Sequence, residues 1–459
     1  MSKALQHQLA KTIKEQGDMA RAAPPALADA SFPEEILVVL RTLKRAGHQA
    51  FLVGGSIRDR LLGKDAKDHD VATDARAEVV MKLFRRVVPT GIKHGTVTVM
   101  LGKVGIEVTT FRGEGEYRDG RRPDSVFFIQ DIVEDLARRD FTINAMAYDP
   151  DARSLVDPFG GAEDLSRRLV RCVRDPLQRF GEDGLRPLRA VRFASVLGFE
   201  IEPATLEAIP KTLPTFAKVA QERIREELSR LLLGREPSRG AALLRETGLL
   251  SLILPEVAAL AGLQVQDHEL FGLTLGRLDA TAPGLELRLA ALLHDIEPGP
   301  APQVAAKLGP AEAALERLRY PAKVIERGGR LVRHRGFVFG EYPSDAALRR
   351  GLARVGLDLV GDLFALGRAQ VAALGREEPG GAVDALEQRV ERILADRPAL
   401  TPGDLALDGA KVMGRLGIAP GPRVGEAMRY LLDRVLDEPG LNTPQALGQL
   451  LDEWQARTA

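Results

Sequence analysis

The spacing of apolar residues predicts a mixed group of short helices and strands between residues 33 and 160. Apolar residues recur at helical intervals in EEILVVLRTLKRAG, residues 34–47, and in AEVVMKLFRRV, residues 77–87. QAFLVGG, residues 49–55, predicts a buried strand that leads into a glycine turn. We expect a helix in SIRDRLLG and further strands in DHDVAT, TVTVML and GIEVTTF, the last two joined by a turn at Gly102.

From about residue 160 onward, the pattern is that of helices joined by short glycine and proline turns. The clearest helix candidates are EDGLRPLRAVRFASVLGF, ERIREELSRLLLG and RGAALLRETGLLSLI. We find no internal repeat with a period of about 20–50 residues. The pattern therefore predicts an α+β fold, in which a small mixed head precedes a long helical region.

The composition is that of an ordinary globular protein. Of 459 residues, 45% are hydrophobic and 28% are charged, and at roughly 150 residues per domain the length suggests about three domains. The single cysteine, Cys172, allows no intramolecular disulfide, which fits a reducing cytosol. We see neither a secretory signal nor an apolar run long enough to span a membrane, so we expect a cytoplasmic protein without a membrane partner.

The formal net charge is zero, so nucleic-acid binding would depend on a local basic surface. Residues 167–193 form one arginine-rich segment. Its arginines are Arg167, Arg168, Arg171, Arg174, Arg179, Arg186, Arg189 and Arg192. Such a run is typical of a solvated helix face, but the guanidinium group is also well suited to binding phosphates.

Asp68 and Asp70 are the first candidates for chemistry. In a strand, residues two apart point to the same side, so the two carboxylates would lie close together. A divalent cation relieves their mutual repulsion, and Mg²⁺ prefers a few carboxylates together with substrate phosphates and water. The alternative interpretation is an exposed strand end that carries two solvated acids.

The residues before and after this pair strengthen the first interpretation. Gly54 and Gly55 form a strand-to-helix turn that would let the backbone approach a phosphate, and Arg58 follows within one helical turn. These features are also compatible with a simple tight turn and with a surface ion pair between Arg58 and Asp59. Glu107, on a later strand, is our candidate for a third metal-binding acid, and it could equally be a strand-edge acid.

LVGGSIRDRLLG followed by KDHDVATDA resembles the signature of class II tRNA nucleotidyltransferases and bacterial poly(A) polymerases, which belong to the polymerase-β-like superfamily. Further motifs follow in the same order, including PTGIKHGTVTV, EVTTFR, DLARRDFTINAMAYDP, DPFGG, RFGEDGLRPLRAVRFASVLGF and QERIREEL. The resemblance extends from about residue 35 to residue 233. It implies a nucleotidyltransferase head followed by helical neck, body and tail domains.

The resemblance implies specific roles for residues of the head. Asp68 and Asp70 would bind the catalytic Mg²⁺ ions, and Gly54, Gly55 and Arg58 would contact the triphosphate. Residues of ARRDFTINAMA would recognise the ribose, since a carboxylate and an amide can both bond to a 2′-hydroxyl. These residues are Arg139, Asp140 and Asn144. Asp140 could also cap a helix, because it precedes an apolar run.

The segment EDGLR matches the motif that selects the nucleotide without a template. Asp183 and Arg186 would share one helix face and read the Watson–Crick edge of CTP or ATP. A surface salt bridge between them is the alternative. From the same arginine-rich segment we assign Arg189 to nucleotide binding. We assign Arg171, Arg174 and Arg192 to RNA binding. In ERIREE we expect Glu222, Arg223 and Glu227 to brace helices.

Two features bear on which member of the family this is. GIKHGTVTV stands where poly(A) polymerases usually carry an arginine-rich motif, and GEGEYRDGRRPDSV is a full-length loop of the kind that CC-adding members lack in part. We therefore expect addition of CCA to the 3′ end of tRNA from CTP and ATP. Addition of the terminal A only, poly(A) synthesis and RNA binding on an inactive scaffold are the alternatives.

LRLAALLHDIEPG resembles an HD phosphohydrolase motif at His294 and Asp295. His268 lies upstream, but Leu273 stands where a further histidine is usual, and EP replaces the usual GK. We interpret the segment as a degenerate HD-like element used for packing or tRNA contact. An active phosphodiesterase is the alternative.

The boundaries that we expect are 1–32 for an N-terminal extension ending in an Ala/Pro-rich linker and 33–160 for the head. The helical part would divide into a neck, a body and a tail. Their ranges would be 161–235, 236–340 and 341–459.

Overall fold

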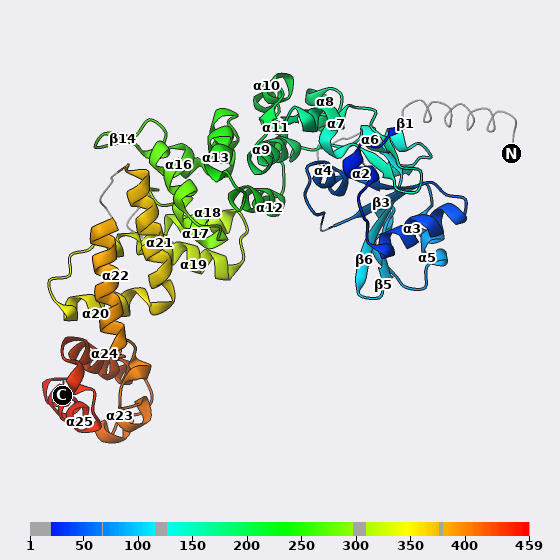
Figure 1. Cartoon of the computed structure of the whole chain (residues 1–459). Helices are drawn as coiled ribbons and strands as arrows, with labels where there is room; N and C mark the ends of the chain where they lie inside the picture. The colour runs from blue at the N-terminus through cyan, green and yellow to red at the C-terminus, as the bar shows by residue number, and fades with distance from the viewer. Residues whose placement is uncertain (1–19, 67, 115–125, 297–308, 376–379, 459) are drawn as a thin grey trace, which may run out of the picture. The chain divides into compact units, whose positions relative to one another are not determined.

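The computed structural model describes residues 20–66, 68–114, 126–296, 309–375 and 380–458. The chain forms two compact units, the first of which ends at Ile253 and the second of which begins at Leu254 (Figure 1). This division falls later than the neck–body boundary expected at residue 235. Most of the loop GEGEYRDGRRPDSV lies outside the described residues.

An eight-stranded sheet forms the centre of the head, in the order β1-β10-β9-β2-β3-β6-β5-β4. Its strands are β1 (Ala20–Ala22), β2 (Ala50–Val53), β3 (Asp70–Thr73), β4 (Val87–Gly91), β5 (Thr96–Leu101), β6 (Val104–Thr110), β9 (Ala147–Asp149) and β10 (Ser154–Val156). β3 pairs with β2 in antiparallel and with β6 in parallel register. Both registers include Asp70, which is opposite Val53 on one side and Glu107 on the other.

Helices pack their apolar faces onto this sheet. Their bounds are α3 (Glu34–Arg45), α4 (Gly55–Leu61), α5 (Ala77–Leu83) and α6 (Ile132–Ala137). The buried residues of α3, including Val39 and Leu43, recur at the helical spacing expected from the sequence. Ile132 and Leu136 of α6 join Phe111 in the core beneath the end of β2. The predicted helices and strands of the head are therefore present.

The expected linker before residue 33 is wrong for residues 20–32. β1 pairs with β10, and the short helix α2 (Pro25–Ala28) buries Leu27 completely. The hydroxyl of Tyr148 donates a hydrogen bond to the carbonyl oxygen of Leu27 at 3.0 Å. The Ala/Pro-rich composition suggested a linker. The segment packs against the head instead, because Leu27 is buried and all three residues of β1 pair with β10.

The expectation of one helix through EDGLR is also wrong. α8 (Pro176–Glu182) ends before Asp183, and α9 (Arg186–Leu197) begins at Arg186. Gly184 lies in the break, where a Cβ atom would come within 2.7 Å of the carbonyl oxygen of Thr215. This close approach of two backbone segments favours glycine and interrupts the helix.

Among the remaining helices of the first unit, the one predicted in ERIREELSRLLLG is present. They are α7 (Gly161–Ser166), α10 (Pro203–Lys211), α11 (Leu213–Phe216), α12 (Gln221–Leu232), α13 (Pro237–Glu246) and α14 (Leu249–Ile253). RGAALLRETGLLSLI was expected as one helix but forms α13 and α14, because Gly248 adopts a φ of +80° between them.

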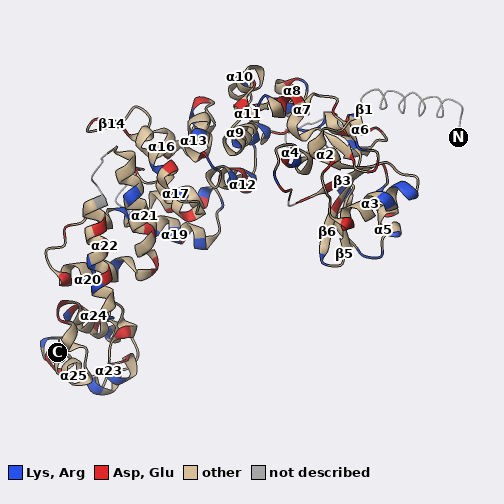
Figure 2. Cartoon of the chain, viewed as in Figure 1, with Lys and Arg blue, Asp and Glu red and all other residues tan. Residues whose placement is uncertain are grey.

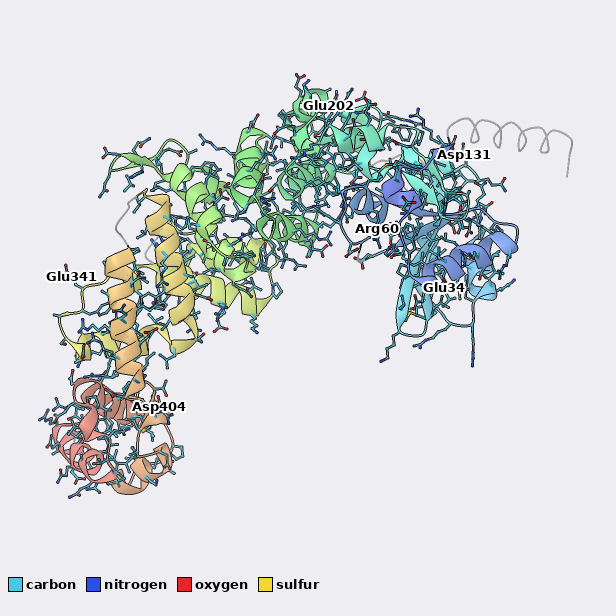
Figure 3. The ribbon with its side chains drawn as sticks, viewed as in Figure 1. Glu34, Arg60, Asp131, Glu202, Glu341 and Asp404 are labelled. Carbon is cyan, nitrogen blue, oxygen red and sulfur yellow. The ribbon has the colours of Figure 1, made fainter. Side chains whose placement is uncertain are left out.

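Polar side chains cap several helices, among them those of Asp131 and Glu202, which Figure 3 labels. Asp131 accepts a hydrogen bond from the backbone N–H of Val133 at the start of α6, at 2.8 Å. Glu202 accepts one from Thr205 at the start of α10, also at 2.8 Å. These bonds satisfy N–H groups that have no partner within the helix.

The described part of the second unit is helical except for a small hairpin of β13 (Gln264–Val265) and β14 (His268–Glu269). Its helices are α15 (Pro255–Ala258), α16 (Leu270–Ala280), α17 (Leu285–Leu292), α18 (Pro310–Arg317), α19 (Ala322–Arg333), α20 (Asp345–Val355), α21 (Leu357–Ala373), α22 (Gly380–Ala395), α23 (Gly409–Leu416), α24 (Pro422–Asp437) and α25 (Pro444–Thr458). Both signs of charge occur on these helices (Figure 2). None of the described helices is long and apolar enough to cross a membrane.

The HD-like segment follows α17 and is paired with a buried arginine. Arg277 is completely buried and donates a hydrogen bond from Nη2 to Asp295 at 2.6 Å. His294 Nδ1 lies 2.7 Å from the other carboxylate oxygen of Asp295. Burial opposes ionisation, but the hydrogen bond from His294 and the charge of Arg277 lower the pKa of Asp295 to about 2. This environment agrees with the packing role expected for a degenerate motif.

Candidate functional site

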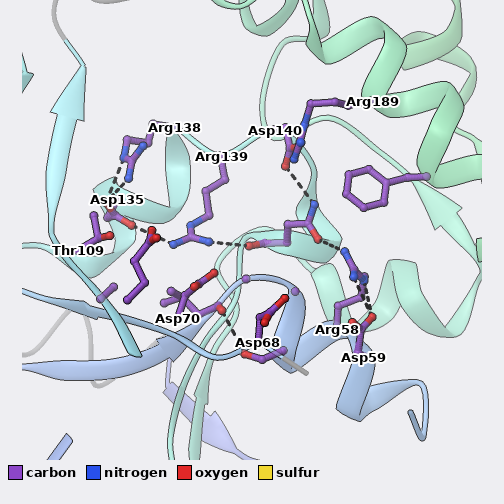
Figure 4. Close-up of a pocket in the computed structure, with 18 of the residues that line it drawn as sticks. Arg58, Asp59, Asp68, Asp70, Thr109, Asp135, Arg138, Arg139, Asp140 and Arg189 are labelled. Carbon is purple, nitrogen blue, oxygen red and sulfur yellow. Dashed lines mark hydrogen bonds and ion pairs between the residues drawn. The ribbon is translucent and has the colours of Figure 1, made fainter. Parts of the chain in front are cut away.

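One cleft of the first unit, with a volume of about 950 Å³, collects most of the residues singled out from the sequence (Figure 4). The ends of β2, β3 and β6 contribute to it, together with α4, α9 and α12. The predicted residues that line it are Gly54, Gly55, Arg58, Asp68, Asp70, Glu107, Arg139, Asp140, Asn144, Asp183, Arg186, Arg189 and Arg192.

Asp68 and Asp70 direct their carboxylates into the same cleft (Figure 4). Only Asp70 lies in the strand, which begins later than expected because β2 ends at Val53 and leaves Asp68 without a partner strand. Desolvation raises the pKa of Asp70, the charge of Arg139 lowers it, and the charge of Asp68 raises it again. A divalent cation would relieve the repulsion between the two carboxylates.

Glu107 is the register partner of Asp70 on the neighbouring parallel strand. Burial raises its pKa, and the charge of Asp70 adds to this effect. In the part of the chain that the structure describes, no three His, Cys, Asp or Glu side chains are grouped closely enough to hold a metal ion alone. Two carboxylates suffice for Mg²⁺ when substrate phosphates supply further ligands, so Asp68 and Asp70 fit such an ion. A ligand role for Glu107 stays a prediction.

Gly54 connects β2 to α4 with a φ of +76°. A Cβ atom at this position would lie 3.1 Å from Nη1 of Arg139 and 3.9 Å from Oδ2 of Asp70. The glycine therefore provides both a backbone conformation that other residues rarely adopt and space beside two cleft side chains.

We expect Gly54→Ala to raise the KM for nucleotides severalfold and to lower the stability by about 1–3 kcal/mol. Its matched control is Gly63→Ala, because Gly63 has a φ of +71° but nothing within 4 Å of the added atom. Steady-state kinetics and urea unfolding of both variants separate the two effects. Equal changes of KM in both variants would contradict the proposed crowding of Arg139.

Four predicted nucleotide-binding residues form one hydrogen-bonded series along the cleft (Figure 4). Nη1 of Arg58 donates to Oδ1 of Asn144 at 2.8 Å, and Nδ2 of Asn144 donates to Oδ1 of Asp140 at 3.2 Å. Arg189 donates from Nε and Nη2 to Oδ2 of Asp140, at 2.8 and 2.6 Å. The series joins α4 and α9 through the short 3-10 helix η2 (Thr142–Asn144).

Asp140 is almost fully buried and remains ionised. Burial opposes ionisation, but the charge of Arg189 and several hydrogen bonds lower its pKa to about 2. One of these bonds comes from the backbone N–H of Phe141 at 2.8 Å. Asp140 does not cap η2, whose preceding residue is Phe141. The carboxylate therefore acts as an anchor for Arg189 and Asn144.

Glu227 of α12 braces α9, as expected for the ERIREE motif. It accepts a hydrogen bond from Nη1 of Arg189 at 3.3 Å and a shorter one from Nε of Arg192. Arg223 of the same motif was expected to brace only, but it lines the cleft and pairs with Asp183 at 2.8 Å.

Asp183 and Arg186 both line the cleft, yet each is engaged with protein groups. Nη1 of Arg186 donates to Glu182 at 2.7 Å, and Nη2 donates to the carbonyl oxygen of Arg138 at 2.9 Å. Oδ1 of Asp183 accepts a hydrogen bond from the backbone N–H of Leu185 at 3.1 Å. The direct salt bridge considered as an alternative is not formed between these two described residues.

Comparison with known proteins places this site in a family. Residues 50–171 match the family described as poly A polymerase head domain, and residues 198–260 match the probable RNA and SrmB-binding site of polymerase A. The chain is 37% identical to a CCA-adding enzyme of Geobacillus stearothermophilus over 398 residues, which is 86% of this chain and 90% of the relative. The chain belongs to the family of CCA-adding enzymes.

A further relative and a solved structure support this assignment. The enzyme of Bacillus velezensis is 35% identical over 419 residues, covering 91% of this chain and 97% of the relative. The crystal structure of the Bacillus stearothermophilus CCA-adding enzyme in complex with CTP aligns with a TM-score of 0.72 and 33% identity, over 93% of this chain and 98% of the other. The protein is thus a nucleotidyltransferase with the polymerase-type head of this family, whose members generally depend on a metal ion.

The arginine-rich segment is not the continuous surface that the sequence suggested. Arg179, Arg186 and Arg192 are buried against carboxylates of Glu182 and Glu227. Arg171 and Arg174 do not line the cleft: Arg171 pairs with a buried aspartate at 2.9 Å, and Arg174 lies over an aromatic ring. RNA binding by Arg171, Arg174 and Arg192 stays a prediction.

Several residues of the cleft were not singled out from the sequence. They include Arg112, Asp135, Arg138 and Phe193. Asp135 lies in DLARRD, next to residues that the motif did identify, and its position one helical turn before Arg138 and Arg139 is the only signal that could have suggested it.

Proposed function

We propose that this protein extends the 3′ end of tRNA with CCA, using CTP, ATP and Mg²⁺ and releasing pyrophosphate. This proposal rests on one observation. The carboxylates of Asp68 and Asp70 line the same cleft as three arginines, Arg58, Arg139 and Arg189. Carboxylates suit metal ions and guanidinium groups suit phosphates. A cytoplasmic location agrees with the use of tRNA and with the single cysteine.

Asp68 and Asp70 would hold the metal ions. When bound, Mg²⁺ lowers the pKa of the attacking 3′-hydroxyl and neutralises charge on the leaving pyrophosphate. Gly54 and Gly55 leave space for the triphosphate beside α4, and Arg58 offers it a charge that Asn144 orients. The site can therefore align an attacking hydroxyl with the α-phosphate of a nucleotide.

Asp183 and Arg186 are our candidates for selecting the base. An aspartate offers acceptors and an arginine offers paired donors to the edges of cytosine and adenine. Since both residues have protein partners in the structure, base binding requires them to exchange these bonds for bonds to the nucleotide. Arg139, Asp140 and Asn144 remain candidates for the ribose.

The deciding experiment measures incorporation of CTP and ATP with Mg²⁺ on three tRNAs that end at the discriminator base, at C or at CC. We expect completion of CCA on all three. Addition of A only to the CC-ending tRNA would indicate an A-adding enzyme, and a long ladder would indicate a poly(A) polymerase. An absence of incorporation with retained tRNA binding would indicate an RNA-binding protein. The Asp68→Ala variant controls for contaminating activity.

A further inference from the structure

Asp135 of α6 is a buried carboxylate that has no role in the proposed nucleotidyl transfer. Only 1% of its surface is exposed. Its Oδ1 accepts hydrogen bonds from Nε and Nη2 of Arg138, at 3.0 and 2.9 Å, and from the backbone N–H of Arg112 at 3.2 Å. Its Oδ2 accepts a bond from Nη2 of Arg139 at 3.4 Å. Asp135 therefore holds two cations at the edge of the cleft.

Arg139 lies between Asp135 and Asp70 (Figure 4). Its second restraint is a bond of 3.3 Å from Nη1 to the carbonyl oxygen of Asn144, and its buried Nε has no hydrogen-bond acceptor in the described structure. Both bonds are long for a charged donor. No ion pair within 4.0 Å joins the described residues Arg139 and Asp70, although the charge of Arg139 influences that carboxylate. Arg139 is thus close to the acidic pair but held away from it.

We propose that Asp135 is a positioning residue that keeps the Arg139 guanidinium away from Asp68 and Asp70, so that this pair stays available to metal ions. The inference rests on the proposed function of the cleft. A guanidinium that loses its partner at one side is attracted to the next carboxylates within reach. If Arg139 turned onto Asp70, it would form an ion pair in the space where a divalent cation has to bind. Asp135 and Asp70 therefore compete for one arginine.

The test uses the full chain and Mn²⁺ as a spectroscopic substitute for Mg²⁺. In Asp135→Asn we expect Mn²⁺ binding, followed by electron paramagnetic resonance without nucleotide, to weaken about tenfold. The Mg²⁺ concentration needed for half-maximal nucleotide addition should rise in parallel. Much of kcat should return at saturating Mg²⁺, because the ion then displaces the arginine.

The double variant Asp135→Asn/Arg139→Gln distinguishes positioning from general bracing. With the guanidinium removed, Mn²⁺ affinity should return to within about twofold of the natural chain. A purely structural role of Asp135 predicts instead that the double variant binds Mn²⁺ no better than the single one. That result would overturn the proposal.

Asp164→Asn is the matched control for loss of a buried, arginine-paired carboxylate. Asp164 is 3% exposed and pairs with Arg171 outside the cleft, so its variant should lose stability and keep its Mn²⁺ affinity. If Asp135→Asn does not fold, Asp135→Glu keeps the charge and should bind Mn²⁺ normally; weakened binding there would also refute the proposal. Absence of Mn²⁺ binding to the natural chain would instead refute the proposed function of the cleft.

Discussion

Replacing Asp70 with asparagine should slow nucleotide addition by about a thousandfold or more, because metal-ion stabilisation of a transition state is worth several kcal/mol. Asparagine keeps the shape of the side chain but removes the charge that a metal ion requires. The fold should persist, since Asp70 is the first residue of β3 and faces the cleft. Single-turnover incorporation measures the rate, and filter binding should show unchanged affinity for tRNA.

The control is an acidic residue of the head that faces solvent and does not line the cleft. The side chain of Glu34 is 73% exposed, and its ion pair with Arg41 spans 3.6 Å. Such pairs contribute little to stability, so Glu34→Gln should retain nearly the full rate. An active Asp70→Asn enzyme would refute the assignment of Asp68 and Asp70 as the metal-binding pair.

Asp140→Asn should lower the free energy of unfolding by about 2–3 kcal/mol at neutral pH, because it leaves the half-buried Arg189 without its shorter ion pair. The amide also weakens the series that reaches Arg58 through Asn144, so the KM for nucleotides should rise. Urea unfolding and steady-state kinetics measure the two effects. Asp437→Asn, which removes an exposed pair with Arg350, should change neither quantity appreciably.

The stability difference between the natural chain and Asp140→Asn should depend on pH in a defined direction. The folded pKa of Asp140 is about 2, below its ordinary value of 3.8. The carboxylate therefore contributes its stabilisation fully above about pH 4 and loses it as the pH falls toward 2. Unfolding measured at pH 7, 4 and 3 should show the difference shrinking in acid. A difference that is constant or larger at pH 3 would contradict the role of the Asp140–Arg189 pair.

Much of the head could be predicted from the sequence because its main elements are marked by local signals. The apolar run that forms β2 ends at Gly54, and the helix α3 has an apolar face followed by Gly47. β1, β9 and β10 were missed because each has three residues, too few for a periodic pattern. Their pairing depends on strands that are distant in the sequence.

For the candidate site too, the sequence identified some features and missed others. Ordered motifs identified many of the charged side chains that line the cleft, but not what holds them in place. The partners Glu182, Glu227 and Asp135 act through buried ion pairs, and burial of a charge is a property of the folded chain. For this reason the sequence suggested an exposed arginine surface where the structure has Arg186 and Arg192 in its interior.

The ion pair between Arg277 and Asp295 affects how experiments that remove metal ions are interpreted. The guanidinium that neutralises Asp295 is covalently part of the chain and keeps its proton throughout the working pH range. A chelating agent such as EDTA therefore cannot extract the cation from beside His294 and Asp295. Activity that disappears on chelation and returns with added Mg²⁺ would consequently not arise from the His294–Asp295 pair, which chelation leaves intact.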